Sequence, residues 1–312
     1  MMQEKNHRLK KSAGYFIVRD RYLYFMLTLP FVYFIVFKYL PMYGVSIAFK
    51  EYNIFLGMAK SEWTGFENFK EIFSSRDFFL VLRNTFTLNF LDLVVGFPAP
   101  IILALLLNEI RSQNYKKTVQ TLLYLPHFLS WVIIGGIVLQ IFSPSYGIIN
   151  TYLKSIGFIK EPIPFLTNGP NWVATYVLVG VWQNIGWGTI IYLAAISGIP
   201  PELYEAAEID GAKRMGKILN ITIPCISSTI IILLILSIGR IALISFERPY
   251  IIGNTLVREY ADVISTYVYR IGIKSSRFSI ATAVGLFQSV ISLIFLVIAN
   301  TIAKRSGHNG IF

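Results

Sequence analysis

The chain has 312 residues, of which 54% are hydrophobic and only 14% are charged, and its formal net charge is +11. Soluble proteins carry about 25% charged residues, so this composition excludes an ordinary soluble domain and indicates an all-α, polytopic membrane protein. The positive charge is dispersed between apolar stretches and forms no basic face with interleaved aromatics, so we expect no nucleic-acid partner. Cys225 is the only cysteine and the three histidines are far apart in the sequence, so we expect neither a disulfide nor a metal site.

Six apolar stretches are each long enough to cross a membrane, which takes about 20 mostly apolar residues. They follow a basic N-terminal tail, residues 1–21, and cover approximately 22–40, 78–107, 118–142, 172–196, 220–246 and 278–303. Pro98 and Pro100 lie inside the second stretch and predict a kink there, because proline removes a helical hydrogen bond. Pro126 lies inside the third.

Six spans place both termini on the same side of the membrane. The short segments on that side are rich in lysine and arginine, so the positive-inside rule places the termini in the cytoplasm. The loop at residues 200–224 is then cytoplasmic, and the long mixed loops at residues 41–77, 143–171 and 247–277 are extracellular.

The loop at 200–224 reads PPELYEAAEIDGAKRMGKILNITIP. Pro201 fits the first turn of a helix, and the residues after it are mostly good helix formers. Gly211 permits a sharp turn, after which a helical pattern resumes into the next span. The sequence therefore predicts a short helix, a glycine turn and a second helix. Ala206 and Ala207 are small enough to let another protein approach, and Glu205 can pair with a basic residue of that partner.

The spacing of Glu205-Ala206-Ala207, Gly211 and Ile221-Thr222-Ile223-Pro224 resembles the EAA loop of binding-protein-dependent ABC importer permeases. Ile223 departs from the leucine that is usual in that family. Other stretches resemble the carbohydrate-uptake branch, which is related to lipoprotein-linked polysaccharide and oligosaccharide permeases. They are residues 37–44, 96–100, 124–131, 266–270 and 281–287. Arg240 is a second departure, since relatives usually have a small residue there.

The resemblance implies a type I ABC importer permease of the MetI-like fold with six transmembrane helices. Residues 22–77 would be the first transmembrane helix with its extracellular loop, residues 78–305 the permease core, and residues 306–312 a cytoplasmic tail. The implied function is to carry oligosaccharides across the bacterial cytoplasmic membrane. The chain itself would be no enzyme and would bind no cofactor. It has no phosphate-binding GxxxxGK[ST] loop.

The partners implied by the resemblance are two ATP-binding subunits that hold ATP and Mg²⁺, a second homologous permease forming a heterodimer, and an extracellular substrate-binding lipoprotein. The ATP-binding subunits would dock on the EAA loop. The residues implied in that coupling are Glu202, Tyr204, Glu205, Ala206, Ala207, Asp210, Gly211 and Pro224.

Polar and ionisable residues inside membrane spans are costly, and we treat them as candidates for the substrate pathway. Amides beside aromatic rings suit a sugar, because hydroxyl groups take bidentate partners and C–H faces pack on rings. The candidates are Asn89, Asp92, Gln183, Asn184, Trp187, Arg240 and Glu247. The structural alternatives are that the amides and glycines of the fourth span serve helix packing, that Asp92 ties two helices or pairs with a basic group such as Arg240, and that Arg240 extends its charge to the membrane surface.

Two other function classes remain as alternatives. An ion-coupled secondary transporter requires buried carboxylates and usually an internal repeat, whereas the spans hold only Asp92 and no repeat is visible. A membrane enzyme would require a pair of aspartates, a Ser/His arrangement or a metal cluster, and none is evident.

Overall fold

The structure is a computed structural model that describes residues 19–307, 310 and 311. Most of the predicted N-terminal tail (1–21) and part of the C-terminal tail (306–312) lie outside the described residues. The described chain is mostly helical, as predicted. Its one sheet pairs two short antiparallel strands, β1 (Lys50–Glu51) and β2 (Glu62–Trp63).

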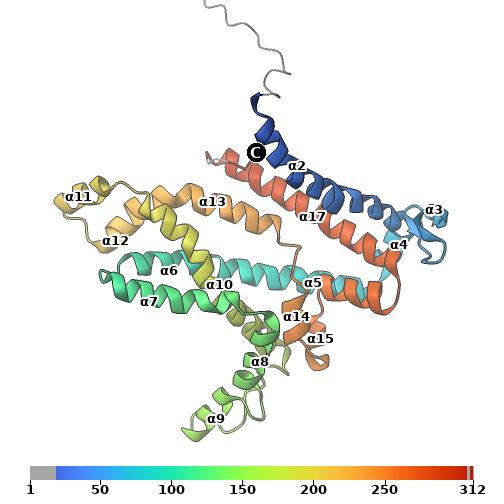
Figure 1. The fold of residues 1–312 in the computed structure, drawn as a ribbon. Coiled ribbons are helices and arrows are strands. Elements are labelled where there is room, and N and C mark those ends of the chain that lie inside the picture. The colour runs from blue at the N-terminus through green and yellow to red at the C-terminus, as the bar shows by residue number, and fades with distance from the viewer. Residues whose placement is uncertain (1–18, 308–309, 312) are drawn as a thin grey trace, which may run out of the picture.

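Five continuous helices in the described residues are long and apolar enough to cross a membrane. They correspond to predicted spans one, two, four, five and six, and they cover Arg21–Phe49, Arg76–Asn108, Gly169–Ser197, Arg214–Gly239 and Phe278–Arg305. The first begins with α2 (Arg21–Phe34), the fourth span is α10 (Gly169–Ser197), and the sixth is α17 (Phe278–Arg305). In Figure 1 the first span lies at the upper right of the helical body, and its last part, the 3₁₀ helix η2 (Leu40–Phe49), packs against α17.

The third span was predicted as one transmembrane helix over residues 118–142, but the structure breaks it into two helices. It consists of α7 (Gln113–Tyr124), a 3₁₀ turn η4 (Leu125–Phe128) and α8 (Trp131–Phe142), and the two arms meet at 105°. Leu129 is extended, with φ −80° and ψ 135°. The hydroxyl of Ser130 then accepts a hydrogen bond from the backbone N–H of Ile133 and caps α8. The chain therefore turns a corner here, and α8 leads downward in Figure 1 to α9 (Ile148–Ser155).

The second span departs from α geometry next to its prolines. It comprises α5 (Arg76–Leu91), a π-helical turn η3 (Asp92–Gly96) and α6 (Pro98–Asn108). Pro98 follows a residue that is itself helical, so it removes one backbone hydrogen bond from a continuous helix. The irregular turn thus lies just before the prolines, and it begins at Asp92.

The fifth span ends seven residues before the predicted boundary at 246, since α13 (Ile223–Gly239) stops at Gly239. A Cβ at Gly239 would lie 2.7 Å from Cδ1 of Leu296, so this glycine lets α13 pack closely on α17. The backbone carbonyls freed beyond α13 are satisfied by side-chain amides. Asn89 donates to the carbonyl of Ile241 and Gln288 donates to that of Ala242, each at 2.6 Å. Unsatisfied carbonyls would be costly at this depth.

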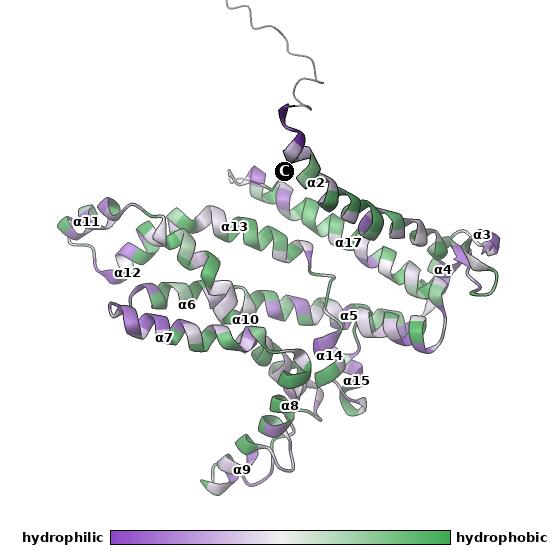
Figure 2. Cartoon of the chain, viewed as in Figure 1, coloured by the Kyte–Doolittle hydropathy of each residue, from purple (hydrophilic) through white to green (hydrophobic). Residues whose placement is uncertain are grey.

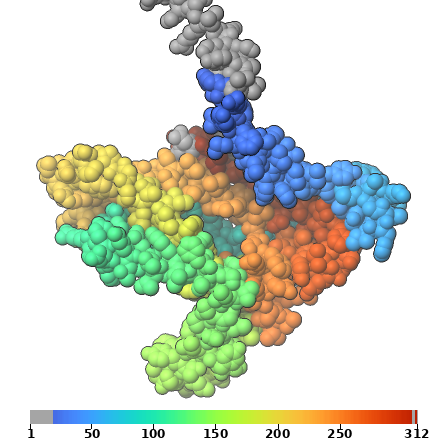
Figure 3. All heavy atoms as spheres, in the orientation of Figure 1, coloured from blue at the N-terminus to red at the C-terminus, as the bar shows by residue number. Residues whose placement is uncertain are grey.

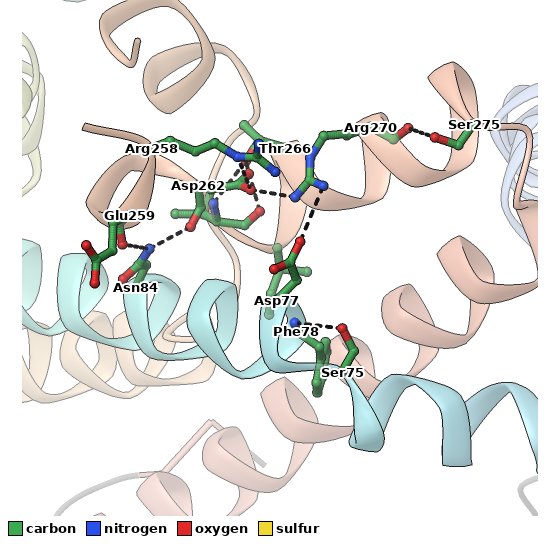
Figure 4. A network of polar contacts seen from close by, with 12 residues as sticks. Ser75, Asp77, Phe78, Asn84, Arg258, Glu259, Asp262, Thr266, Arg270 and Ser275 are labelled. Carbon is green, nitrogen blue, oxygen red and sulfur yellow. Dashed lines mark hydrogen bonds and ion pairs between the residues drawn. The ribbon is translucent and has the colours of Figure 1, made fainter. Parts of the chain in front are cut away.

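The loop predicted at 247–277 is a compact set of short helices. They are α14 (Glu247–Ile252), η6 (Thr255–Val257), α15 (Arg258–Ala261), α16 (Ile264–Val268) and η7 (Tyr269–Lys274). Val257, Val263 and Ile264 are fully buried beneath them. Nδ2 of Asn84 in α5 donates to the backbone carbonyls of Glu259 (2.8 Å) and Asp262 (2.9 Å), as Figure 4 shows. Hydrogen bonds and apolar packing therefore fix this loop on the second span.

The Asp262 carboxylate strengthens this attachment. It binds the guanidinium of Arg270 at 2.6 Å, and Arg270 also lies 3.7 Å from the carboxylate of Asp77 in α5 (Figure 4). The same network thus joins η7, α15 and α5.

The remaining short elements lie at the two ends of the helical body. On the right in Figure 1 are α3 (Gly57–Lys60) and α4 (Glu67–Ser74). On the left, α11 (Pro201–Ile209) and α12 (Arg214–Lys217) project beyond α13, and the space-filling view in Figure 3 shows them as a protruding lobe. Figure 2 shows α13 as largely hydrophobic, whereas polar residues gather on α12 and at the start of α7. The polar lobe is thus continuous with an apolar span.

Candidate functional site

We call residues 200–224 the coupling loop. It has the predicted form of a helix, a glycine turn and a second helix. Gly211 separates α11 from α12 and has φ +76°, a backbone conformation that residues with a side chain rarely adopt. The chain then passes through a π-helical turn, η5 (Ile218–Thr222), into α13, where Pro224 occupies the first helical turn. The coupling loop is therefore a direct extension of the fifth span.

Two polar contacts fasten α11 to the helix that follows. The hydroxyl groups of Tyr204 and Thr222 are 2.9 Å apart and share a hydrogen bond. The ammonium of Lys217 hydrogen-bonds the carboxylate of Glu208, which lowers the pKa of Glu208 below its usual value. Tyr204 also packs against the apolar cluster formed by α6, α10 and α13. A force on α11 can thus reach α13 through both side chains and backbone.

Six of the eight residues predicted to couple this chain to its partners are exposed. Glu202, Glu205, Ala206, Asp210, Gly211 and Pro224 are exposed, whereas Tyr204 and Ala207 are half-buried. Ile209 is 88% exposed. The loop therefore offers acidic, small and apolar groups together on a protruding surface.

A second candidate site is a cavity of about 540 Å³ that we call the central cavity. Its walls come from the α5–η3–α6 span, from α10, from the end of α13 and from Arg248 of α14. Five of the seven predicted pathway residues line it, namely Asn89, Asp92, Asn184, Trp187 and Arg240. The tertiary structure thus brings together residues from three spans that are remote in the sequence.

The other two predicted pathway residues lie elsewhere. Gln183 is buried on another face of α10, where its Nε2 donates to the carbonyl of Leu129 at 3.4 Å. Glu247 is exposed at the start of α14 and does not line the central cavity. Gln183 therefore serves the packing of α10 against the corner between α7 and α8.

Arg248 also lines the cavity and was not among the predicted pathway residues. Its Nη1 lies 2.7 Å from Oδ2 of Asp92 and its Nη2 lies 3.2 Å from Oδ1, so the pair is bidentate. Nη2 also donates to the backbone carbonyl of Tyr176, and the guanidinium lies 3.6 Å from the centroid of the Tyr176 ring. Asp92 therefore pairs with Arg248 and not with Arg240. No local pattern could have indicated this, because Arg248 lies in a segment that reads as a loop.

A glycine makes room for this guanidinium. A Cβ at Gly180 would lie 2.2 Å from Nη2 of Arg248. Trp131 of α8 covers the guanidinium, whose Cζ lies 5.5 Å from the centroid of the Trp131 ring. Four elements thus meet at one arginine, which is only 9% exposed.

Aromatic and amide side chains complete the cavity wall. Trp187 stacks on His127 with ring centroids 4.6 Å apart and an interplanar angle of 3°. Nδ2 of Asn184 donates to the carbonyl of Gly180 at 3.0 Å. These contacts hold the indole and the amide in place at the wall.

No group of three or more histidine, cysteine, aspartate or glutamate residues in the described part of the chain could hold a metal ion.

Residues 81–308 match the model of the family described as binding-protein-dependent transport system inner membrane component. Protein LplB of Bacillus subtilis is 48% identical over 94% of this chain and 92% of that protein. The polygalacturonan/rhamnogalacturonan transport system permease protein YteP of the same organism is 45% identical over 95% of this chain and 92% of that protein.

Solved structures agree with these sequence relatives. A chain of a bacterial alginate ABC transporter, in complex with an alginate pentasaccharide-bound periplasmic protein, superposes with a TM-score of 0.87 and is 41% identical; the match covers 96% of this chain and 99% of that chain. A chain of a bacterial ABC transporter involved in the import of the acidic polysaccharide alginate gives a TM-score of 0.85 at 42% identity, covering 93% of this chain and 97% of that chain. The protein therefore belongs to the binding-protein-dependent transport system inner membrane components, as a multi-pass permease of the ABC importer class.

Proposed function

We propose that this chain is a permease subunit of an ABC importer that carries oligosaccharides across the bacterial cytoplasmic membrane. The main support is the match over nearly the whole chain to transporter subunits whose names or titles specify polygalacturonan/rhamnogalacturonan and alginate. The central cavity agrees with this assignment, because it combines the Trp187 ring with the amides of Asn89 and Asn184. Rings and amides of this kind suit sugar faces and hydroxyl groups.

Energy would enter through the coupling loop. Separate ATP-binding subunits hold ATP and Mg²⁺ and dock on the exposed residues of α11, with Glu205 meeting a basic group of the partner. Tyr204 and Lys217 pass the movement of α11 on to α13. The far end of α13 borders the central cavity at Arg240. Closure of the ATP-binding subunits can therefore bias the transport pathway between two states.

The assembly would contain further partners. A second homologous permease, forming a heterodimer with this chain, completes the pathway, and an extracellular binding lipoprotein delivers the substrate to the loops at 41–77, 143–171 and 247–277. The alginate transporter in complex with its periplasmic protein supports the latter partner. Both termini and the coupling loop are then cytoplasmic, in agreement with the positive-inside rule.

The ion-coupled alternative is weakened by one contact. Asp92 is the only carboxylate among the described residues that line the central cavity, and Arg248 binds it in bidentate fashion. A carboxylate held in this way is poorly placed to bind and release a proton or a sodium ion in each cycle. The pair instead fits a structural role.

The experiment is to co-express the chain with the other subunits of its importer and to compare Glu205→Lys with Glu161→Lys. Both substitutions reverse an exposed acidic charge, but Glu161 lies in a loop predicted to be extracellular. We expect Glu205→Lys to abolish co-purification of the ATP-binding subunit and ATP-dependent glycan uptake, while Glu161→Lys retains co-purification. Co-purification of the Glu205→Lys complex at wild-type yield would contradict docking at the coupling loop.

A further inference from the structure

The charges that line the central cavity do not cancel. Three lining residues are ionic, namely Asp92, Arg240 and Arg248. Asp92 and Arg248 neutralise each other as a bidentate pair. Arg240 makes no side-chain hydrogen bond or ion pair with any residue that the structure describes, and its side chain is exposed. One positive charge is therefore left over in the cavity.

An unpaired charge is expensive within a membrane protein and usually marks a functional position. The position of Arg240 reduces this cost in part, because it follows the C-terminus of α13, where the helix dipole favours a cation. The dipole does not provide a partner for the guanidinium, however. A guanidinium has several N–H donors in a planar fork that matches a carboxylate.

The surroundings of Arg240 are suited to a sugar. Trp187 lines the same cavity, and this residue is 46% exposed. The amides of Asn89 and Asn184 are held at the wall by hydrogen bonds to backbone carbonyls, at 2.6 Å to Ile241 and 3.0 Å to Gly180. A sugar ring can pack on the indole while its hydroxyl groups meet the amides and its acidic group meets Arg240.

We propose that Arg240 is a specificity-determining residue that selects oligosaccharides bearing carboxylate groups, such as oligouronates, by pairing with a carboxylate as the chain passes through the central cavity. This inference rests on the proposed function and specifies its substrate class.

The test compares two probes of equal length, tetragalacturonate and its fully methyl-esterified form, which differ in charge. The complete importer is reconstituted in vesicles with the wild type, Arg240→Gln or Arg240→Lys. Lys304→Gln serves as the control, because it removes an exposed cation from the C-terminal end of α17, away from the cavity. Binding of each probe to the isolated binding protein is measured separately, and uptake is normalised to it.

We expect Arg240→Gln to lower the normalised uptake of tetragalacturonate by about tenfold or more, since one charge-assisted hydrogen bond is worth about that much. Uptake of the ester should be unchanged, Arg240→Lys should retain an intermediate preference for the acid, and Lys304→Gln should behave as the wild type. Yield and ATPase activity without substrate establish that each variant assembles.

Three results would overturn the inference. Equal losses for acid and ester would make Arg240 a structural residue, for example one that pairs with an acid of the second permease. Unchanged uptake of both probes by Arg240→Gln would remove it from recognition. A wild type that imports neutral arabino-oligosaccharides but not tetragalacturonate would refute the acidic substrate class while leaving the proposed function intact. Failure of the proposed function looks different, since the wild type would then show no ATP-dependent uptake of any glycan.

Discussion

Arg248 and Asp92 are 156 residues apart in the chain, yet the guanidinium of Arg248 donates two hydrogen bonds, of 2.7 and 3.2 Å, to the carboxylate of Asp92. Asp92 begins the π-helical turn of the second span, and Arg248 belongs to a short helix of the 247–277 loop. The pair thus connects that loop to a membrane span at the wall of the central cavity, and Gly180 supplies the space it needs.

Breaking this pair from one side should destabilise the protein strongly. Their side chains are 11% and 29% exposed. We expect Arg248→Met or Asp92→Asn to cost about 3 kcal/mol, because each leaves a largely desolvated charge without its partner. The double variant should recover much of that loss. Thermal unfolding of the purified complex, followed by tryptophan fluorescence, measures both.

The control for these single and double variants is the ion pair of Arg277 and Glu71, whose side chains are 49% and 51% exposed. Glu71→Gln should change stability by less than about 1 kcal/mol, because water screens an exposed pair. Additive effects of the two substitutions at Asp92 and Arg248 would show that the pair has no energetic coupling.

Gly180→Ala should displace the Arg248 guanidinium. The added Cβ would lie 2.2 Å from Nη2, whereas a Cβ at Gly136 would have no atom within 4 Å. Alanine is otherwise the better helix former by about 1 kcal/mol, so Gly136→Ala should be neutral or stabilising while Gly180→Ala lowers the unfolding temperature. In an Arg248→Met background the cost of Gly180→Ala should largely disappear. If Gly180→Ala lowered the unfolding temperature just as much in that background, the clash would involve a group other than Arg248.

Gly211→Ala should impair coupling more than folding. Gly211 and Gly307 have similar backbone conformations, with φ +76° and +79°, and neither has an atom that would contact a new Cβ. Alanine at either site should cost roughly 1–2 kcal/mol of local strain. We expect only Gly211→Ala to reduce substrate-stimulated ATPase activity of the assembled importer, because only that turn orients α11. If both variants reduced the ATPase activity equally, the loss would reflect general instability and not the orientation of α11.

Tyr204→Phe tests the link between α11 and α13. It removes the 2.9 Å hydrogen bond to Thr222 and keeps the apolar packing of the ring. The expected stability loss is about 1 kcal/mol. We expect the main effect to be uncoupling, in which ATP hydrolysis continues but less glycan is imported per ATP. Tyr115→Phe, at a tyrosine that is 62% exposed on α7, is the control and should leave this ratio unchanged.

Much of the fold follows from the sequence because its determinants are local. Long apolar stretches in the sequence identify five of the spans. Most of the predicted span ends lie within a few residues of the helix ends in the structure. The coupling loop could likewise be predicted, since Pro201 starts its helix and Gly211 makes its turn through their own backbone preferences. Five residues of the central cavity were found because polar groups in apolar spans stand out in any sequence.

Only the tertiary structure decided the bend at Leu129, the early end of α13 at Gly239 and the pairing of Asp92. Each of these depends on atoms supplied from a remote part of the chain. Asn89 satisfies carbonyls that a longer α13 would have satisfied itself, and Arg248 reaches Asp92 through space that Gly180 leaves open. Hydropathy and helix propensity describe a segment and its immediate neighbours. Whether a buried charge or a free carbonyl finds a partner depends on which remote group the packed structure brings within hydrogen-bonding distance.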